Sequence, residues 1–94
     1  MRIKWLRLAL KDLDDIAQYI KQDNLGAAKR VVIIIKEKVK LLSNHPHIGR
    51  PGRVPETREL IVDSIPFIVS YRIKNNEIEI LRVLHCSRRW PEKF

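Results

Sequence analysis

The sequence has one cysteine, few acidic residues and no long apolar segment. The single cysteine, Cys86, excludes an internal disulfide and is typical of a protein in a reducing compartment. The longest uninterrupted apolar run, residues 31–35, is far shorter than the roughly 20 residues needed to cross a bilayer. Charged residues lie among the first seven positions, where a secretory signal peptide would be apolar. We therefore expect a cytoplasmic protein without a membrane partner.

Signatures of bound cofactors are also missing. The three histidines and the cysteine lack the paired spacing of zinc ligands. No glycine-rich loop precedes an expected helix, so nothing in the sequence would cradle a nucleotide phosphate. Asp12, Asp14 and Asp15 lie in the early turns of an expected helix, where carboxylates complement the helix dipole. The sequence therefore predicts no metal site and no small-molecule cofactor.

Positive charge is abundant. The sequence has 19 lysines and arginines against 11 aspartates and glutamates, which gives a net charge of +8. A solvated basic surface would explain this balance, and so would a polyanionic partner such as nucleic acid or an acidic protein. Seven of the nine lysines precede residue 45, whereas seven of the ten arginines lie at Arg50 or later. Because arginine makes bidentate contacts with phosphate and carboxylate, we expect the functional surface in the second half of the chain.

The first half of the chain predicts one strand and two helices. Residues 2–6 alternate as a short strand does, and apolar residues at helical spacing predict a helix over residues 9–21. Asp23 or Asn24 would cap a second helix that runs to about residue 42, and the short link indicates an antiparallel hairpin. Ile33 and Ile34 fall outside the main apolar stripe of this helix, which leaves apolar surface for a third element or a partner.

The second half predicts three strands after a loop rich in proline and glycine. The expected strands cover residues 58–62, 67–73 and 77–84. Short turns between them make an antiparallel meander, with the N-terminal strand at an edge of the sheet or beside the last strand. We therefore expect a single α+β domain over residues 1–94, with the order β-α-α-β-β-β and the helical hairpin packed on the sheet.

Two arginines and a histidine of the expected strands are candidates for chemistry. Arg72 and Arg82 would project from one sheet face and form an anion site or, equally well, pair with glutamates of neighbouring strands. The glutamates in question are Glu59, Glu77 and Glu79. His85 ends the last strand, where it would act as an acid or base in metal-free RNA cleavage or simply make a structural hydrogen bond.

Other residues would contact an anionic target. Trp90 would stack on a nucleic-acid base or, alternatively, cover the core and hold the C-terminal tail. The arginines assigned to target or anion binding are Arg50, Arg53, Arg58, Arg88 and Arg89. Cys86 is not assigned a role with His85, because neighbouring strand residues point to opposite faces.

Four segments of the chain form a specific set. They are residues 12–20 (DLDDIAQYI), 45–60 (HPHIGRPGRVPETREL), 66–73 (PFIVSYRI) and 80–91 (ILRVLHCSRRWP). In this order they resemble the RelE/ParE toxin superfamily over nearly the whole chain, and the combination is far more specific than any one segment. The resemblance implies a helical hairpin on an antiparallel sheet and the toxin of a type II toxin–antitoxin module, which arrests growth when free of its antitoxin.

The resemblance also implies a protein partner. In this superfamily a cognate antitoxin neutralises the toxin by wrapping an extended segment around it. We assign Ile33 and Ile34 to this interface because their apolar surface is not needed by the expected core. Since the toxin is strongly cationic, we expect the antitoxin segment to be acidic as well as apolar.

Members of the superfamily differ in their target. RelE-like members cut mRNA on the ribosome, whereas ParE-like members block DNA gyrase without cleaving nucleic acid. Arg58, Arg72 and Arg82 fall near positions where the nucleases keep cations, but the C-terminal tyrosine of those nucleases is missing and Trp90 has no phenolic proton to donate. The two good helices and the leucine–histidine ending of the last strand favour the ParE-like interpretation.

We therefore predict an inhibitor of DNA gyrase. The first alternative is a ribosome-dependent mRNA endonuclease in which His85, Arg82 and Arg72 are catalytic. The second alternative is a non-toxic basic module that binds nucleic acid.

Overall fold

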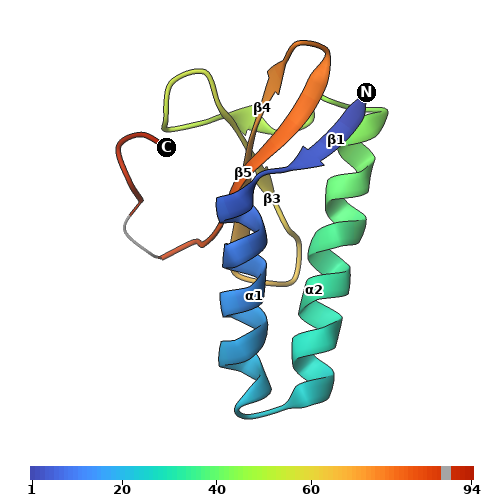
Figure 1. Cartoon of the computed structure of the whole chain (residues 1–94), viewed down its shortest axis with the longest axis vertical. Helices are drawn as coiled ribbons and strands as arrows, with labels where there is room; N and C mark the ends of the chain where they lie inside the picture. The colour runs from blue at the N-terminus through green and yellow to red at the C-terminus, as the bar shows by residue number, and fades with distance from the viewer. Residues whose placement is uncertain (88–89) are drawn as a thin grey trace.

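A helical hairpin lies on one face of a five-stranded sheet, and the strand order is β1-β5-β4-β3-β2 (Figure 1). The structure is a computed structural model that describes residues 1–87 and 90–94, so Arg88 and Arg89 lie outside the described residues. The elements are β1 (Arg2–Trp5), α1 (Arg7–Lys21), α2 (Leu25–Lys40), β2 (Arg50–Pro51), β3 (Arg58–Ile61), β4 (Phe67–Lys74) and β5 (Glu77–His85).

The helical hairpin has the predicted topology. α1 begins at Arg7, two residues before the predicted start, directly after the extended backbone of Leu6. Asn24 is the cap of α2, since its side chain accepts a hydrogen bond from the backbone N–H of Ala27 at 3.0 Å. A short 3₁₀ turn, Leu41–Ser43, extends α2 close to the predicted end. Within the described residues, no helix is both long enough and apolar enough to cross a membrane.

The sheet differs from the predicted meander in two respects. β2 is a fifth strand that the sequence did not predict, and it pairs with β3 in antiparallel register, Arg50 opposite Glu59. β1 runs parallel to β5, so the sheet is mixed. The predicted antiparallel meander is confirmed, because β3, β4 and β5 are antiparallel neighbours. The predicted place of the first strand is also confirmed, because β1 lies at an edge of the sheet and beside the last strand.

The main core lies between the hairpin and the facing side of the sheet. Ala28, Ile35 and Val39 are buried along α2, so the apolar run of residues 31–35 lies within the second predicted helix. The sheet contributes alternate residues of its two long central strands, as expected for strands with one face on the core. These buried sheet residues are Val69, Tyr71, Ile78, Ile80 and Val83.

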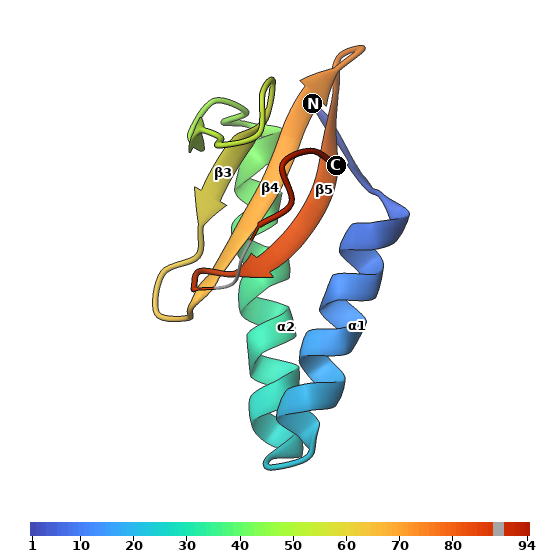
Figure 2. The same cartoon turned by 90° about the vertical axis from the view of Figure 1, so that its left-hand side faces the viewer.

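The other face of the sheet is covered as well. Ile68, Leu81 and Leu84 alternate with the core residues and are buried although no helix lies over them. The loop between β2 and β3 and the C-terminal tail, residues 90–94, cover this face, and the tail crosses it in Figure 2. The tail and this loop therefore bury the sheet face that lies opposite the helical hairpin.

Tyr71 fixes the segment that leads into β2. Its hydroxyl donates a hydrogen bond to the Pro46 carbonyl at 2.8 Å and accepts one from the Gly49 N–H at 3.0 Å. A Cβ atom at Gly49 would lie 2.6 Å from the tyrosine ring, so only glycine fits at this position. Burial raises the pKa of Tyr71, against the Gly49 hydrogen bond and the charge of Arg58. Tyr71 thus places Arg50, the residue that follows Gly49.

Candidate functional site

The second half of the chain contains a buried carboxylate that binds two arginines. Glu59 of β3 is only 2% exposed. Its Oε1 accepts hydrogen bonds from Nε and Nη2 of Arg50, at 3.2 and 3.0 Å. Its Oε2 accepts hydrogen bonds from the backbone N–H and the Nε of Arg53, at 2.8 and 3.1 Å. Arg50 and Arg53, both predicted to bind an external anion, therefore bind an internal one.

Glu59 stays ionised in this position. Burial raises the pKa of its carboxyl, but the hydrogen bonds from Arg53 and Arg50 outweigh burial and lower the pKa below its ordinary value. A charge can be buried at low cost only when it is paired and hydrogen-bonded, and both carboxylate oxygens of Glu59 meet that condition. The pairing of β2 with β3 brings Arg50 opposite Glu59 and so fixes the network.

Trp90 is part of the same cluster. The guanidinium of Arg53 lies over the indole ring at 3.9 Å from its centre, a cation–π contact. The indole ring also contacts Phe94, with the ring centres 6.5 Å apart. Of the two predicted roles of Trp90, the structure supports the second, because the residue holds the C-terminal tail. We call Glu59, Arg50, Arg53 and Trp90 the tail clasp.

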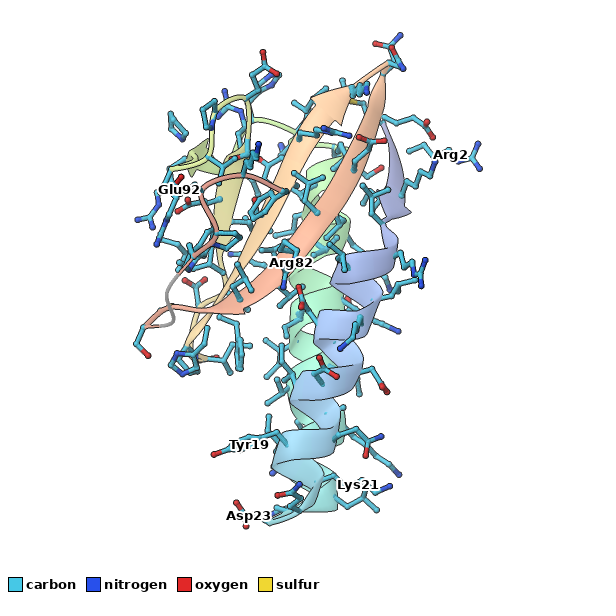
Figure 3. The ribbon with its side chains drawn as sticks, turned by 60° about the vertical axis from the view of Figure 1, so that its left-hand side comes forward. Arg2, Tyr19, Lys21, Asp23, Arg82 and Glu92 are labelled. Atoms are coloured by element: carbon cyan, nitrogen blue, oxygen red, sulfur yellow. The ribbon has the colours of Figure 1, made fainter. Side chains whose placement is uncertain are left out.

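Arg82 joins β5 to α1. Its Nε and Nη2 donate to the two carboxylate oxygens of Asp12 at 2.8 and 3.0 Å, and the Val83 N–H donates to the same carboxylate at 2.9 Å. Figure 3 shows Arg82 pointing from the strand toward the helix. The hydrogen bonds to Asp12 raise the pKa of Arg82 against the effect of burial. The prediction that Asp12 merely complements the helix dipole was therefore wrong, since the first turn of α1 contains no acidic residue.

Arg72 binds a different carboxylate. Its Nε donates to Oε1 of Glu79, the residue opposite on β5, and this hydrogen bond lowers the pKa of Glu79. The register of the β4–β5 pair shifts between Ser70 and Tyr71, so the side chains of β5 do not alternate regularly. The prediction that Arg72 and Arg82 project from one face depended on regular alternation. The two arginines do not form a joint anion site, and the alternative of pairing with a glutamate is confirmed for Arg72.

The two other predicted glutamate partners have different roles. Glu59 binds Arg50 and Arg53, as described above. Glu77 lies 3.7 Å from Arg2 across the β1–β5 pair. Neither glutamate is paired with Arg72 or Arg82.

His85 makes local contacts at the end of β5. Its Nδ1 accepts a hydrogen bond from the backbone N–H of Ser87 at 3.1 Å and lies 2.8 Å from the Ser87 hydroxyl. Its ring packs edge-on against Phe67, with the ring centres 5.4 Å apart. These contacts fit the simpler of the two predicted roles, a structural hydrogen bond at the end of a strand.

One polar pocket does bring predicted cations together. Arg58 and Arg72 line a hollow of about 400 Å³ together with His47. Arg58 is held there by a 2.7 Å hydrogen bond from Nη1 to the carbonyl of Gly49. Two candidate arginines of neighbouring strands, Arg58 of β3 and Arg72 of β4, thus line one hollow.

Two apolar grooves lie along the helical hairpin. One groove of about 350 Å³ runs between the helices, with Leu25, Val32 and Ile33 on its walls and Lys21 and Lys29 beside them. The other, about 540 Å³, lies between α1 and the end of the sheet. Its lining includes Ile16, Tyr19, Ile20, Val31, Phe67 and His85, and Figure 3 shows Tyr19 projecting from the hairpin.

The predicted antitoxin contacts are exposed. Ile33 is 58% exposed and Ile34 37% exposed, so both lie outside the core as predicted. Within residues 1–87 and 90–94, no three side chains of histidine, cysteine, aspartate or glutamate come together as ligands for a metal ion.

Comparisons with known proteins identify the family. The sequence profile of the ParE toxin of type II toxin–antitoxin systems, parDE, matches residues 3–90. The chain belongs to the ParE toxin family. A solved structure from the chromosomal ParDE toxin–antitoxin system of P. aeruginosa is similar to this ParE-family chain, with a TM-score of 0.81 and 38% identity over 90% of this chain and 95% of that one.

Two further relatives support the assignment of the chain to this toxin family. The protein Y4kP of Sinorhizobium fredii is 46% identical over 91 residues, which are 97% of this chain and 94% of that protein. Toxin RelE2 of Caulobacter vibrioides is 31% identical over 87 residues, which are 93% of this chain and 97% of that protein. The predicted RelE/ParE superfamily and the predicted toxin–antitoxin role are thereby confirmed.

Sequence reasoning missed two residues that organise the ParE-family chain. Asp12 acts on Arg82, which lies 70 residues away in the sequence, and no local pattern indicates that contact. Glu59 did give a signal, because it is a glutamate beside the apolar Leu60 in a short strand that follows two arginines. It was interpreted only as a cross-strand partner for Arg72 or Arg82.

Proposed function

We propose that this ParE-family toxin arrests growth by binding DNA gyrase and blocking it without cleaving nucleic acid. The observation that supports this proposal is the separation of the residues that cleavage would need. Arg82 is engaged by Asp12 on the helix side, and Arg72 is engaged by Glu79 on β5. His85 accepts a hydrogen bond from the backbone N–H of Ser87, two residues along the chain, and its Nδ1 lies 2.8 Å from the Ser87 hydroxyl.

Metal-free RNA cleavage needs a base, an acid and cations around a single phosphate. An arginine that already makes a bidentate contact with a carboxylate, as Arg82 does, has given its planar donor pair to that partner. Turning it toward a phosphate would leave the Asp12 carboxylate without its cation, with only the Val83 N–H as a donor. The geometry therefore supports a toxin that acts by binding.

A supercoiling assay with purified gyrase tests this proposal. We expect the toxin to inhibit supercoiling at micromolar concentration, and we expect the double variant Arg72→Ala, His85→Ala to inhibit about as well as the parent. These substitutions remove two of the three nuclease candidates and leave the Asp12–Arg82 contact intact. Supercoiling that continues unchanged at a large excess of folded toxin would contradict the proposal.

The second candidate function is ribosome-dependent cleavage of mRNA. Two observations favour it, namely the pocket shared by His47, Arg58 and Arg72 and the similarity to a protein named Toxin RelE2. Mapping of mRNA ends in a purified translation system separates the two functions. New ends that need both ribosomes and toxin would support cleavage, whereas intact message with normal protein output would dismiss it.

A type II toxin has an antitoxin partner, and we propose that this partner occupies the groove between α1 and α2. The groove has apolar walls that include Ile33, and Lys21 and Lys29 lie beside it. An amphipathic segment with acidic residues along its edges would complement both features. A second copy of the chain fits less well, because it would bring the same lysines together.

Substitution of Ile33 tests this interface. We expect Ile33→Asp to weaken antitoxin binding by at least about tenfold, because it places a negative charge in an apolar contact that faces an acidic partner. Thermal stability should hardly change, since Ile33 is mostly exposed. Ile48→Asp is the matched control, because Ile48 is similarly exposed but lies away from the hairpin. Equal affinity of both variants for the antitoxin, measured by calorimetry, would remove Ile33 from the interface.

A further inference from the structure

The C-terminal tail is held in place by side chains. Trp90 lies under the guanidinium of Arg53, and Phe94 packs against Trp90. Phe94 and Leu81 also line one hollow together with Val54 of the β2–β3 loop. Because these are contacts between side chains rather than strand pairing, the position of the tail depends on where Arg53 holds its guanidinium.

Glu59 determines the position of that guanidinium. Arginine has a long and flexible side chain, so a stacking contact needs something that fixes the plane of the guanidinium. Glu59 binds the backbone N–H and the Nε of Arg53 through Oε2, and the Nη2 of the same guanidinium donates to Oε1 at 3.4 Å. One face of the guanidinium is thereby left for the indole ring of Trp90. Glu59 of β3 thus positions Arg53 in the loop, and Arg53 in turn positions the tail.

The tail clasp also presents charge to solvent. Two guanidiniums share one carboxylate, so the cluster has a surplus of one positive charge. The side chains of Arg50 and Arg53 remain 51% and 44% exposed although their partner is buried. Arginine and tryptophan are among the residue types that dominate the free energy of protein–protein binding. Here Arg53, one of two half-exposed arginines bound to Glu59, stacks on the half-buried Trp90.

We propose that the tail clasp is an interaction surface for an acidic patch on a target protein, and that Glu59 is its positioning residue. Glu59 acts through Arg53, which holds Trp90 and the tail in the orientation that binds the target. The inference rests on the proposed function in one respect, because it takes gyrase as that target. A nucleic acid bound at the same cluster is the competing outcome.

The first experiment measures the position of Trp90 without any partner. The chain has two tryptophans, so a Trp5→Phe background leaves Trp90 as the only one. In that background we expect Glu59→Gln and Arg53→Lys each to raise the acrylamide quenching constant of Trp90 at least about twofold. Arg53→Lys keeps the charge and loses the planar stack, so it remains informative if Glu59→Gln folds poorly. Glu77→Gln, at an ion pair between β1 and β5 that involves no residue of the tail clasp, should leave quenching unchanged.

The second experiment measures binding by the same variants in the natural Trp5 background. We expect Glu59→Gln and Arg53→Lys to raise the toxin concentration needed for half inhibition of gyrase by about tenfold, with Glu77→Gln unchanged. A merely structural role would shift the unfolding midpoint and leave the potency of the folded variants intact.

The outcomes distinguish the positioning role of Glu59 from the binding role of the tail clasp. Unchanged quenching in both folded variants would overturn the role of Glu59, and raised quenching with full potency would overturn the interaction surface. Tight binding of the parent to a DNA duplex that is lost in Arg53→Lys, with gyrase binding unaffected, would reassign the surface to nucleic acid. A parent toxin that leaves gyrase active would contradict the proposed function, while the quenching result would still decide the role of Glu59.

Discussion

Two distant parts of the molecule depend on Glu59. It binds Arg50 in β2, a strand of two residues, and it binds Arg53, which stacks on Trp90 of the tail. A glutamate with two cationic partners stays charged at a depth where an unpaired carboxylate would take up a proton. The lowered pKa of Glu59 is therefore the measurable consequence of the cluster.

Low pH should reduce the free energy of unfolding, because Glu59 takes up a proton. Because the pKa of Glu59 is lower in the folded state, its contribution is present above the ordinary glutamate pKa of about 4.3 and is lost as the pH falls through the folded value. We expect Glu59→Gln to be less stable at neutral pH by roughly 1–3 kcal/mol, since the arginine donors lose an ionised acceptor. Its free energy of unfolding should also decline less steeply in acid.

Urea unfolding of the parent and of Glu59→Gln from about pH 7 to about pH 3 measures both effects. Glu79 also has a lowered pKa, so the variant should retain part of the acid sensitivity. Parallel stability curves for the two proteins would show that Glu59 does not titrate as described.

At the scale of elements, one carboxylate joins α1 to β5. β1 covers the edge of β5 only from Glu77 to Ile80, and beyond that point the Val83 N–H would have no strand partner on this side. Asp12 accepts that N–H and the Arg82 guanidinium together, so the helix takes the place of the missing strand. The contact fixes the angle at which α1 leaves the sheet.

Removing this contact should destabilise one region more than the rest. We expect Asp12→Ala to lower the free energy of unfolding by roughly 1–3 kcal/mol, because a backbone N–H and a guanidinium lose their acceptor. Hydrogen exchange of the Val83 amide should speed up by more than that of the central β4 amides. Asp14→Ala is the matched control, since Asp14 is exposed on the same helix. An equal effect of both substitutions would mean that Asp12 acts only through charge.

The elements also show what sequence reasoning can reach. Both helices and the three later strands were predicted from periodicity and turns, because these signals are local. β2 was missed because two residues, one of them Pro51, carry no alternating pattern. The contacts of Asp12 and Glu59 were missed because they depend on the packing angle of α1 and on the path of the β2–β3 loop. Of the site, the exposure of Ile33 and Ile34 was predicted correctly, and the joint face of Arg72 and Arg82 was not.

For the whole molecule, net charge governs how it meets its partners. A charge of +8 on a chain of 94 residues attracts acidic surfaces over a distance of about one Debye length. Several of its arginines are bound internally, so the long-range attraction comes from the sum of the charges rather than from any one of them.

Antitoxin binding should therefore depend on salt. We expect the association rate constant to fall by about tenfold or more between about 0.05 and 0.5 M sodium chloride, because screening removes the electrostatic steering. The dissociation rate constant should change less, since the apolar contacts proposed for the helix groove are not screened. Stopped-flow mixing with the purified antitoxin measures both constants. An association rate that does not respond to salt would exclude electrostatic steering.

The pairing of β1 with β5 has a consequence for the timing of synthesis. Arg2 lies opposite Glu77, so the earliest strand to leave the ribosome finds its neighbour in the sheet only after the latest strand has been made. Pairing over such a sequence separation is slow compared with helix formation, and until it occurs the hairpin has no finished sheet to pack on. β1 can therefore take its place in the sheet only after residues 77–80 of β5 have been made.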